Sequence, residues 1–407
     1  MSRILLIWEL GADYGYLSRF LPIALEMKKR GHEPILILRD LCWAEKILGG
    51  HGLSWLQGPI WQANLGGLPP PISYPEILFH HGFSHHFGLV SICRAWRNLI
   101  TALNPDLLFI EYGAASMLAS SGLDIPRIRV GTGFTVPPLL QPIPSFHWWE
   151  NQPVKRLLDI ESSVLSSANK ALGELKVNPI DSLAEMLTSQ EEAIFCSPSL
   201  DHYPQRVNGN YWGSIQNLDQ GATPNWPSHF GKRVFAYIKT SSPHFGTVLK
   251  ALSELDASTV VHAPGISLKN IKTYESGNLV FSLDPVRMED ARQQCDLGIC
   301  HAGAGTTEAL LTAGKPVLLL PMQGEQESTS RRVEQLGAGL WVHQEAKVVN
   351  FKKLIKRLLN EPSFTQKAQD FASMNQMSPQ PERISKLIDQ CEALISSHTK
   401  GSSSAQG

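Results

Sequence analysis

Short apolar runs alternate with segments of helical apolar spacing along almost the whole chain. Residues 4–8 form the first apolar run, a glycine-containing stretch follows, and residues 17–30 place apolar side chains at helical intervals. Gly31 ends this segment, and residues 34–38 form a second apolar run. A strand, a crossover helix and a second buried strand make one βαβ unit, whose strands lie parallel. The opening of the chain therefore predicts a parallel sheet covered by helices.

The alternation occurs in two blocks. Residues 216–231 between them are rich in Asn, Gln, Gly, Pro and Ser and lack apolar periodicity, which is typical of a linker. The first block continues with apolar runs at residues 107–110, 128–130 and 193–196, and the second has them at 234–238, 259–263, 279–282, 297–300 and 317–320. The fold class predicted is α/β, with two doubly wound Rossmann-like domains facing a central cleft.

The expected boundaries follow from these blocks. They are a first domain over residues 1–213, a linker over 214–231, a second domain over 232–375, a last helix over 376–396 that packs back on the first domain, and a disordered tail over 397–407.

Composition narrows the function classes. The 407 residues include 43% hydrophobic and 18% charged residues and have a formal net charge of −1, so no global charge favours nucleic acid. The six cysteines include no C-x-x-C pair, which argues against a zinc site or a disulfide framework. The N-terminus lacks the features of a signal peptide, and no stretch reaches transmembrane length. We therefore expect a cytoplasmic protein without an integral membrane segment.

Residues 296–339 hold the strongest chemical signal. An apolar strand ends at His301, the small residues Ala302, Gly303, Ala304 and Gly305 form a tight turn, and Thr306-Thr307 opens a helix. A turn without bulky side chains lets backbone N–H groups approach a diphosphate, and the positive end of the helix dipole favours its charge. His301 is expected to add a side-chain donor beside the phosphates. A second strand ends at Pro321, so the loop behind it places Glu325 and Gln326 at the same sheet edge.

These residues resemble the nucleotide-sugar-dependent glycosyltransferases of the plant, macrolide and glucuronosyl type, which have the two-domain GT-B fold. That family reads H-x-G-x-G-[ST], then G-x-P, then P-x-x-x-[DE]-Q. The chain matches at His301, Gly303, Gly305, Thr306, Gly314, Pro316, Pro321, Glu325 and Gln326. Its opening also resembles the family's G-H-x-x-P and R-G-H at Gly15-Tyr16, Pro22 and Gly31-His32, and residues 211–214 resemble the family's domain end.

The resemblance implies that the first domain binds an acceptor and the second a UDP- or dTDP-sugar, as a co-substrate rather than a bound cofactor. It places Pro285 near the nucleotide base. The implied donor residues are His301, Ala302, Gly303, Ala304, Gly305, Thr306, Thr307, Pro285, Val286, Thr240, Glu325 and Gln326. No metal site is expected.

The chain departs from the family at the catalytic base. The usual histidine is Tyr16 here, and an unperturbed phenol is a poor base at neutral pH. The family's orienting aspartate corresponds to Glu111, which follows the apolar run at residues 107–110 and is expected to face the cleft. Glu111 is therefore the first candidate for the base, with Asp13 or Glu9 as alternatives. An equally plain role for Glu111 is to accept hydrogen bonds from the Tyr16 hydroxyl or loop amides.

A second departure concerns the donor ribose. Many members have a glutamate eight residues after the motif histidine that holds the ribose hydroxyls, whereas this chain has Ala309 there and Glu308 one position earlier. One helical position is a rotation of about 100°, so Glu308 is expected to miss the ribose.

Two aromatic clusters leave alternatives open. His80, His81, His85 and His86 have a spacing that fits two turns of one helix face, and they suit an acceptor lining or a solvated helix better than a metal site, because no carboxylate or cysteine accompanies them. His147, Trp148 and Trp149 either stack on an acceptor or cap the core.

The predicted reaction is inverting transfer of a sugar from a nucleoside-diphosphate sugar to a small molecule or lipid-like aglycone, with no nucleic acid partner. The alternative is a catalytically silent member of the same fold that binds or activates a partner. A sugar-nucleotide epimerase of this fold is a lesser alternative.

Overall fold

A computed structural model describes residues 1–12, 15–62, 66–217, 220–227 and 231–404, with side chains described as far as residue 399. The chain forms two compact units. Unit 1 comprises residues 1–195, 202–216 and 378–407, and unit 2 comprises residues 196–201 and 217–377. Neither unit is one continuous stretch, because residues 196–201 belong to unit 2 and the C-terminal segment belongs to unit 1.

Unit 1 is built on a sheet of six parallel strands in the order β3-β2-β1-β4-β5-β6. The strands are β1 Arg3–Trp8, β2 Glu33–Leu38, β3 Ser54–Gln57, β4 Leu107–Glu111, β5 Arg127–Gly131 and β6 Glu191–Ile194. β1, β2 and β4 are almost entirely buried, as continuous apolar runs predict for strands covered on both faces.

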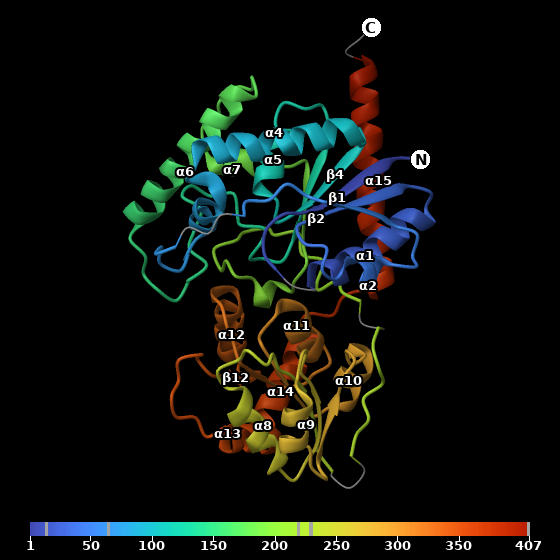
Figure 1. The fold of residues 1–407 in the computed structure, drawn as a ribbon, viewed down its shortest axis with the longest axis vertical. Helices are drawn as coiled ribbons and strands as arrows, with labels where there is room; N and C mark the ends of the chain where they lie inside the picture. The colour runs from blue at the N-terminus through green and yellow to red at the C-terminus, as the bar shows by residue number, and fades with distance from the viewer. Residues whose placement is uncertain (13–14, 63–65, 218–219, 228–230, 405–407) are drawn as a thin grey trace. The chain divides into compact units, whose positions relative to one another are not determined.

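Helices cover both faces of this sheet (Figure 1). Alternate residues of β1 point to opposite faces, so Leu5 and Ile7 join one core while Ile4, Leu6 and Trp8 join the other. The first core packs under α3 Tyr74–Leu78, α4 His86–Leu103, α5 Ala114–Ser120, α6 Val154–Glu174 and α7 Leu183–Met186. The second packs under α1 Gly15–Lys29, α2 Ala44–Leu48 and α15 Gln380–Ser404.

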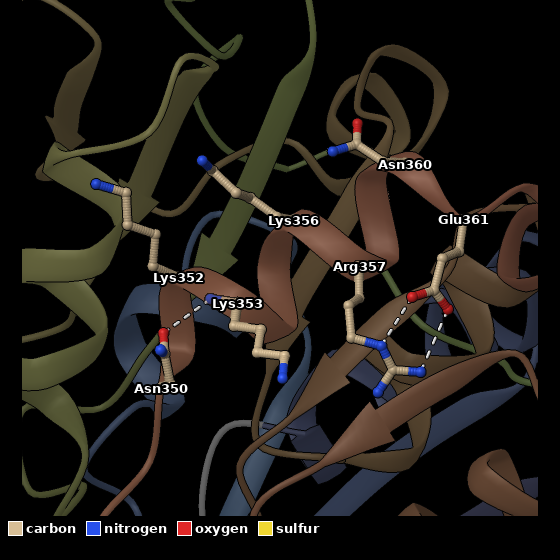
Figure 2. A pocket seen from close by; sticks show the side chains of 7 residues that line it. All are labelled: Asn350, Lys352, Lys353, Lys356, Arg357, Asn360 and Glu361. Atoms are coloured by element: carbon tan, nitrogen blue, oxygen red, sulfur yellow. Dashed lines mark hydrogen bonds and ion pairs between the residues drawn. The ribbon is translucent and has the colours of Figure 1, made fainter.

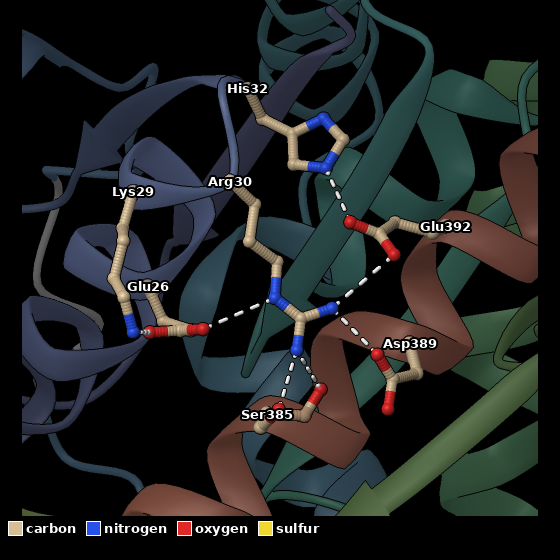
Figure 3. Close-up of polar contacts among 7 residues, drawn as sticks. All are labelled: Glu26, Lys29, Arg30, His32, Ser385, Asp389 and Glu392. Carbon is tan, nitrogen blue, oxygen red and sulfur yellow. Dashed lines mark hydrogen bonds and ion pairs between the residues drawn. The ribbon is translucent and has the colours of Figure 1, made fainter.

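α15 is fixed to α1 by a cluster of polar contacts (Figure 3). The Arg30 guanidinium, just after α1, donates to Asp389 Oδ1 at 2.6 Å, to Glu392 Oε2 at 3.3 Å and to the Ser385 carbonyl at 2.9 Å. His32 Nε2 lies 2.9 Å from Glu392 Oε1. Beneath these groups, the α15 residues Ile384, Leu387, Ile388 and Cys391 are buried in the second core. α15 therefore packs as a structural element of unit 1.

Unit 2 repeats the architecture with the sheet order β12-β11-β10-β7-β8-β9, again all parallel. Its strands are β7 Arg233–Tyr237, β8 Ser258–His262, β9 Leu279–Ser282, β10 Leu297–Cys300, β11 Val317–Leu319 and β12 Gly339–Trp341. Its helices are α8 Phe245–Ser253, α9 Leu268–Tyr274, α10 Met288–Gln294, α11 Ala304–Thr312, α12 Gly324–Leu336, α13 Phe351–Asn360 and α14 Pro362–Met374. One core lies under α8 and α13, and another under α10, α11, α12 and α14.

The strand order has the same functional consequence in both units. Connections on the two sides of β1 and β4 run in opposite directions across the sheet, and the same holds for β7 and β10. In open parallel sheets, ligands bind beyond the carboxyl ends of the strands at such a switch point. The residues that follow β1 and β4, and those that follow β7 and β10, are therefore the places to examine.

Three expectations from the sequence need correction. The sequence reading missed β3 and β12, which are short edge strands. The tail expected to be disordered from residue 397 is helical as far as Ser404, because α15 continues through it. The histidines of residues 80–86 do not share one helix face, since the π-helix η1 Phe79–Phe83 breaks at His81 and Gly82, where the Gly82 φ is +99°. No helix in the described part of the chain is long and apolar enough to cross a membrane.

Candidate functional site

The turn after β10 brings backbone to the switch point of unit 2. Ala302 is buried and has a φ of +61°, a conformation that costs free energy for any residue except glycine. The turn lets Gly303 act as the N-cap of α11, with φ −62° and ψ 133°. Gly303 is exposed, and a Cβ added to it would meet no protein atom within 4 Å. The helix begins at Ala304, earlier than the sequence predicted.

The N-terminus of α11 has the features of an anion site. Its N-cap supplies no side-chain acceptor, because Gly303 has none. Ala304, Gly305 and Thr306 are partly exposed in the first turn, whereas Thr307 is buried against Cys300. The first N–H groups of a helix point outward along its axis and bear the positive end of its dipole. Phosphate oxygens placed beside Gly303 would meet both.

His301 is held by hydrogen bonds on both ring nitrogens. Nδ1 lies 3.0 Å from the Leu320 carbonyl, which can only accept, so Nδ1 donates. Nε2 accepts from the Lys239 backbone N–H at 2.5 Å. The expectation that His301 offers a donor to the phosphates is therefore wrong for this arrangement, because the neutral ring has its only proton on Nδ1. Instead, His301 ties the loop after β7 to the loop after β10 across the switch point.

Glu325 and Gln326 lie in the first turn of α12. Gln326 is buried, and its Oε1 accepts from the Met322 N–H at 2.8 Å, which fixes the loop after β11. Glu325 is partly exposed. Its carboxylate near the helix N-terminus is stabilised by the dipole.

Glu308 is committed to the protein itself. It is 2% exposed, and it accepts from the Ser197 N–H at 3.1 Å and the Ser197 hydroxyl at 2.7 Å. Ser197 precedes the short 3-10 helix η2 Pro198–Leu200, which packs with unit 2. The expected ribose position, Ala309, is buried as well. Neither residue therefore offers a solvent-facing carboxylate.

The remaining predicted donor residues lie in loops at the same sheet edge. Pro285 and Val286 follow β9, where the Pro285 carbonyl accepts from the Ala222 N–H at 2.8 Å and the Arg287 N–H donates to Ala222 at 2.8 Å. Part of the expected linker is thus paired with the 285–287 segment. Thr240 is exposed in the turn that follows β7.

Glu111 is not presented to any ligand. It ends β4 with no exposed surface and forms an ion pair with Arg19 of α1, which is also buried. Two charges withdrawn from water remain stable only when they are well paired, so this contact has a structural role. The expectation that the Glu111 carboxylate faces an acceptor is wrong, because the carboxylate has no exposed surface. The partner found for it is the Arg19 guanidinium, where the sequence had suggested the Tyr16 hydroxyl or loop amides.

Glu9 lies at the switch point of unit 1, directly after β1. Its Oε1 accepts from the Ala115 N–H at 3.1 Å and its Oε2 from the Ser116 N–H at 2.9 Å, in the first turn of α5. Burial raises the pKa of the Glu9 carboxyl to about 7, although the hydrogen bonds from Ser116 and Ala115 lower it. A carboxyl that changes charge near neutral pH is suited to proton transfer.

The other two candidates for the catalytic base are Tyr16, which packs against aromatic and cationic side chains, and Asp13. The Tyr16 ring stacks on Trp8 with centroids 4.8 Å apart, and the Arg19 guanidinium lies 5.9 Å from its centroid. A Cβ on Gly11 would collide with the Tyr16 hydroxyl, so glycine lets the loop after β1 approach this ring. Asp13 lies outside the described residues.

The two aromatic clusters also differ. His85 is the N-cap of α4, where its Nδ1 accepts from the Gly88 N–H at 3.0 Å, and His81 Nδ1 lies 2.8 Å from the Ile77 carbonyl. Within the described ranges, no three His, Cys, Asp or Glu side chains are grouped to hold a metal ion. His147 stacks on Trp149 with centroids 4.6 Å apart, and all three residues of 147–149 are partly exposed.

Comparison with known proteins connects these features to a class. Residues 246–394 match the C-terminal domain model of the erythromycin biosynthesis protein CIII-like family. Aclacinomycin-T 2-deoxy-L-fucose transferase of Streptomyces galilaeus is 28% identical over 151 residues, covering 36% of this chain and 34% of that protein. Zeaxanthin glucosyltransferase of Pseudescherichia vulneris is 22% identical over 323 residues, covering 74% and 78%.

A similar fold occurs in solved structures. The glycosyltransferase VinC in complex with dTDP has a TM-score of 0.70 at 15% identity, with 97% of this chain and 99% of that chain covered. These matches confirm the resemblance and the two-domain α/β GT-B fold predicted from the sequence. The chain spans about a third of the length of the Streptomyces galilaeus relative, so its own reaction and substrates are matters for proposal.

Proposed function

We propose that this chain is an inverting glycosyltransferase that moves a sugar from a nucleoside-diphosphate sugar to a small-molecule or lipid-like acceptor. The observation that supports this most is a difference between equivalent places in the two units. In unit 1 the helix after β4, α5, has its N-terminus neutralised by Glu9. In unit 2 the helix after β10, α11, has a glycine N-cap with open space before it. The Glu9 carboxylate lies at the N-terminus of α5, and a diphosphate from the donor would lie at the corresponding position of α11.

The chemistry follows from this placement. The acceptor attacks the anomeric carbon in line, the bond to the diphosphate breaks, and the leaving charge is stabilised by the α11 amides and dipole. His301 acts as a positioning residue, because it fixes the two loops of the switch point. Glu9 takes the acceptor proton. Tyr16, whose ring stacks on Trp8 at the end of β1, shapes the approach of the acceptor. Asp13 stays the alternative base.

The donor nucleotide is proposed to be dTDP rather than UDP. Glu308 is occupied by Ser197 and Ala309 is apolar, so the described part of α11 offers no carboxylate for a ribose 2′-hydroxyl. A dTDP-sugar lacks the 2′-hydroxyl and therefore loses no hydrogen bond at α11. VinC, which shares the fold, was solved with dTDP.

The acceptor class is proposed from the names of relatives. Those names refer to aclacinomycin T and to zeaxanthin, and the rhamnosyltransferase SpnG, which shares the fold, was solved with the spinosyn aglycone. The partly exposed aromatic residues 147–149 suit contact with the apolar part of an aglycone.

The test is calorimetric titration of the full chain with dTDP and UDP. Gly303→Val should weaken dTDP binding at least tenfold, because its side chain enters the space before α11, where a Cβ meets no protein atom within 4 Å. Gly277→Val is the matched control, since Gly277 also has room for a Cβ and lies elsewhere in unit 2. Equal dTDP affinity in the two variants would remove the proposed phosphate site, and tighter binding of UDP than dTDP would reverse the donor assignment.

One observation favours the silent-subunit alternative: both described carboxylates near the unit 1 switch point, Glu9 and Glu111, are at least 95% buried. Incubation with dTDP-sugars and cell extract separates the two. Sugar transfer supports the enzyme, and tight binding of dTDP-sugars without turnover supports the subunit. Release of free sugar and nucleotide in place of transfer would point to an epimerase-type protein.

A further inference from the structure

Helix α13 forms the floor of an open cavity of about 570 Å³ in unit 2 (Figure 2). The lining consists of Asn350, Lys352, Lys353, Lys356, Arg357, Asn360 and Glu361, which we call the α13 basic surface. Four of these seven residues are cationic and one is anionic. The whole chain has a formal net charge of −1, so positive charge is concentrated on this helix.

Half of this charge has no compensating partner in the described structure. Arg357 forms a two-point ion pair with Glu361, at 2.8 and 3.2 Å, and Lys352 lies 3.3 Å from Glu254. Lys353 and Lys356 are exposed, and no ion pair is found for either among the residues that the structure describes. They are three positions apart and therefore project from the same side of the helix.

The opposite side of α13 is fixed in the protein. Phe351, Ile355 and Leu358 are at most 3% exposed and belong to the core under α8. The helix therefore has no apolar face available for insertion into another medium. Next to its N-terminus, Val348 is 96% exposed and follows the exposed Lys347. The surface thus combines a row of cations with a single aliphatic side chain at its end.

We infer that the α13 basic surface docks unit 2 on anionic lipid bilayers by electrostatic adsorption. The helix is ten residues long and spans about 15 Å, which suits the spread headgroups of a membrane better than one compact anion. Each Lys or Arg near an anionic membrane strengthens adsorption about fivefold. The cations are fewer than the six to ten phosphate contacts that a nucleic-acid site commonly makes, and the lining contains no aromatic side chain for base stacking.

The test is co-sedimentation of the full chain with sucrose-loaded vesicles. We expect binding to vesicles of phosphatidylglycerol and phosphatidylcholine at low salt, none to pure phosphatidylcholine, and loss in 0.5 M NaCl, because salt screens charges at an exposed surface. Lys353→Glu/Lys356→Glu should lower the partition coefficient about tenfold or more. Lys269→Glu/Lys272→Glu on α9 is the matched control, since these exposed lysines have the same spacing and should leave binding unchanged.

Several results of these assays would contradict electrostatic adsorption of the α13 basic surface to membranes. Absence of binding to the anionic vesicles at low salt, or an equal loss in both double variants, would overturn it. So would binding of a duplex DNA oligonucleotide or of inorganic triphosphate that is lost in Lys353→Glu/Lys356→Glu while vesicle binding persists. The assay needs no nucleotide-sugar and no turnover, so its result is independent of the proposed transferase activity.

Discussion

At the residue scale, two buried glutamates near one sheet edge have different partners and therefore different chemistry. Glu111 forms an ion pair with the permanent charge of Arg19, whereas Glu9 accepts hydrogen bonds from Ala115 and Ser116 in the first turn of α5 and feels the Arg39 cation only through a weaker electrostatic interaction. A guanidinium does not lose its proton in proteins, so a positive charge always lies beside Glu111. Amide donors stabilise the Glu9 anion less than burial destabilises it. Glu9 is thus poised to exchange a proton near neutral pH.

Glu9 should impose a pH limb on catalysis. A base works when deprotonated, so kcat/KM should rise with pH up to about 7 and then level off. Glu9→Gln should lower turnover about 10² to 10⁴-fold and abolish this limb, while dTDP binding in unit 2 stays unchanged. Persistence of the limb in Glu9→Gln would move the base to Asp13.

The raised pKa of Glu9 also makes the stability of the folded protein depend on pH. Because the folded-state pKa of Glu9 is raised, the folded state retains this proton where the unfolded chain has released it. The contribution of Glu9 to the free energy of unfolding should therefore decrease as pH rises from about 4.5 to about 7, and stay constant above that range. The difference in denaturation midpoints between wild type and Glu9→Gln across these pH values measures it.

Glu111→Gln should act on stability before catalysis. Removing one charge of a buried pair leaves the other uncompensated, which costs about 3–5 kcal/mol. The double variant Arg19→Met/Glu111→Leu should recover much of this loss, because an apolar pair needs no compensation. Thermal unfolding of the three proteins measures both effects. A Glu111→Gln protein of wild-type stability with turnover lowered a hundredfold would restore Glu111 as the base.

At the scale of elements, sequence patterns predicted the buried strands and the edge strands β6 and β9, and missed the edge strands β3 and β12. β1, β2, β4 and β10 are continuous apolar runs because both of their faces are covered. β3 reads Ser-Trp-Leu-Gln, is largely exposed, and is formed by pairing with β2, so its own residues give little signal. β12 has three residues and pairs with β11 in the same way.

The site was predictable to a similar extent. Glycines and small residues after a strand indicated the turn before α11, since they allow tight backbone turns that bulky side chains would obstruct. The partners of buried side chains could not be predicted in this way. Arg19 and Glu111, for example, are 92 positions apart and come into contact only in the folded protein. For the same reason, the Ser197 contact of Glu308 and the hydrogen bonds of His301 had no counterpart in local sequence.

α15 provides a prediction for an element that is distant in sequence from its neighbours. Arg30→Ala should destabilise the docking of α15 by about 1.5–3 kcal/mol, because hydrogen bonds to Asp389, Glu392 and Ser385 are lost from a partly buried guanidinium. Hydrogen exchange should accelerate in α15. Lys29→Ala is the control, since Lys29 is largely exposed and its ion pair in the described structure is with Glu26 of its own helix, which contributes at most about 0.5 kcal/mol. Equal exchange rates in the two variants would contradict this account.

At the scale of the whole molecule, the chain passes between its two units more often than a simple tandem arrangement requires. Residues 196–201 belong to unit 2, the chain returns to unit 1 at residue 202, passes to unit 2 again at residue 217 and returns to unit 1 at residue 378. This excursion supplies the hydrogen bonds that satisfy Glu308, the packing of Leu200 in a unit 2 core, and a carbonyl of Asp201 that accepts from Arg332 at 3.0 Å. A contribution from the first half of the sequence thus completes the unit that holds the proposed donor site.

The contribution of residues 196–201 to unit 2 can be tested by removing the Ser197 hydroxyl, which donates to Glu308. Ser197→Ala leaves the Glu308 carboxylate, which is 2% exposed, with one hydrogen bond fewer, and this should cost about 1–3 kcal/mol of stability. Because Glu308 lies in α11, dTDP affinity should fall several-fold at the same time. In a double-mutant cycle with Glu308→Gln, the two changes should be non-additive by about 0.5–3 kcal/mol, since they remove the same contact. Ser253→Ala on the exposed end of α8 is the control, where the lost hydroxyl contact is local and solvated. If both serine variants unfold at the same temperature and bind dTDP alike, the 196–201 excursion does not support the donor site.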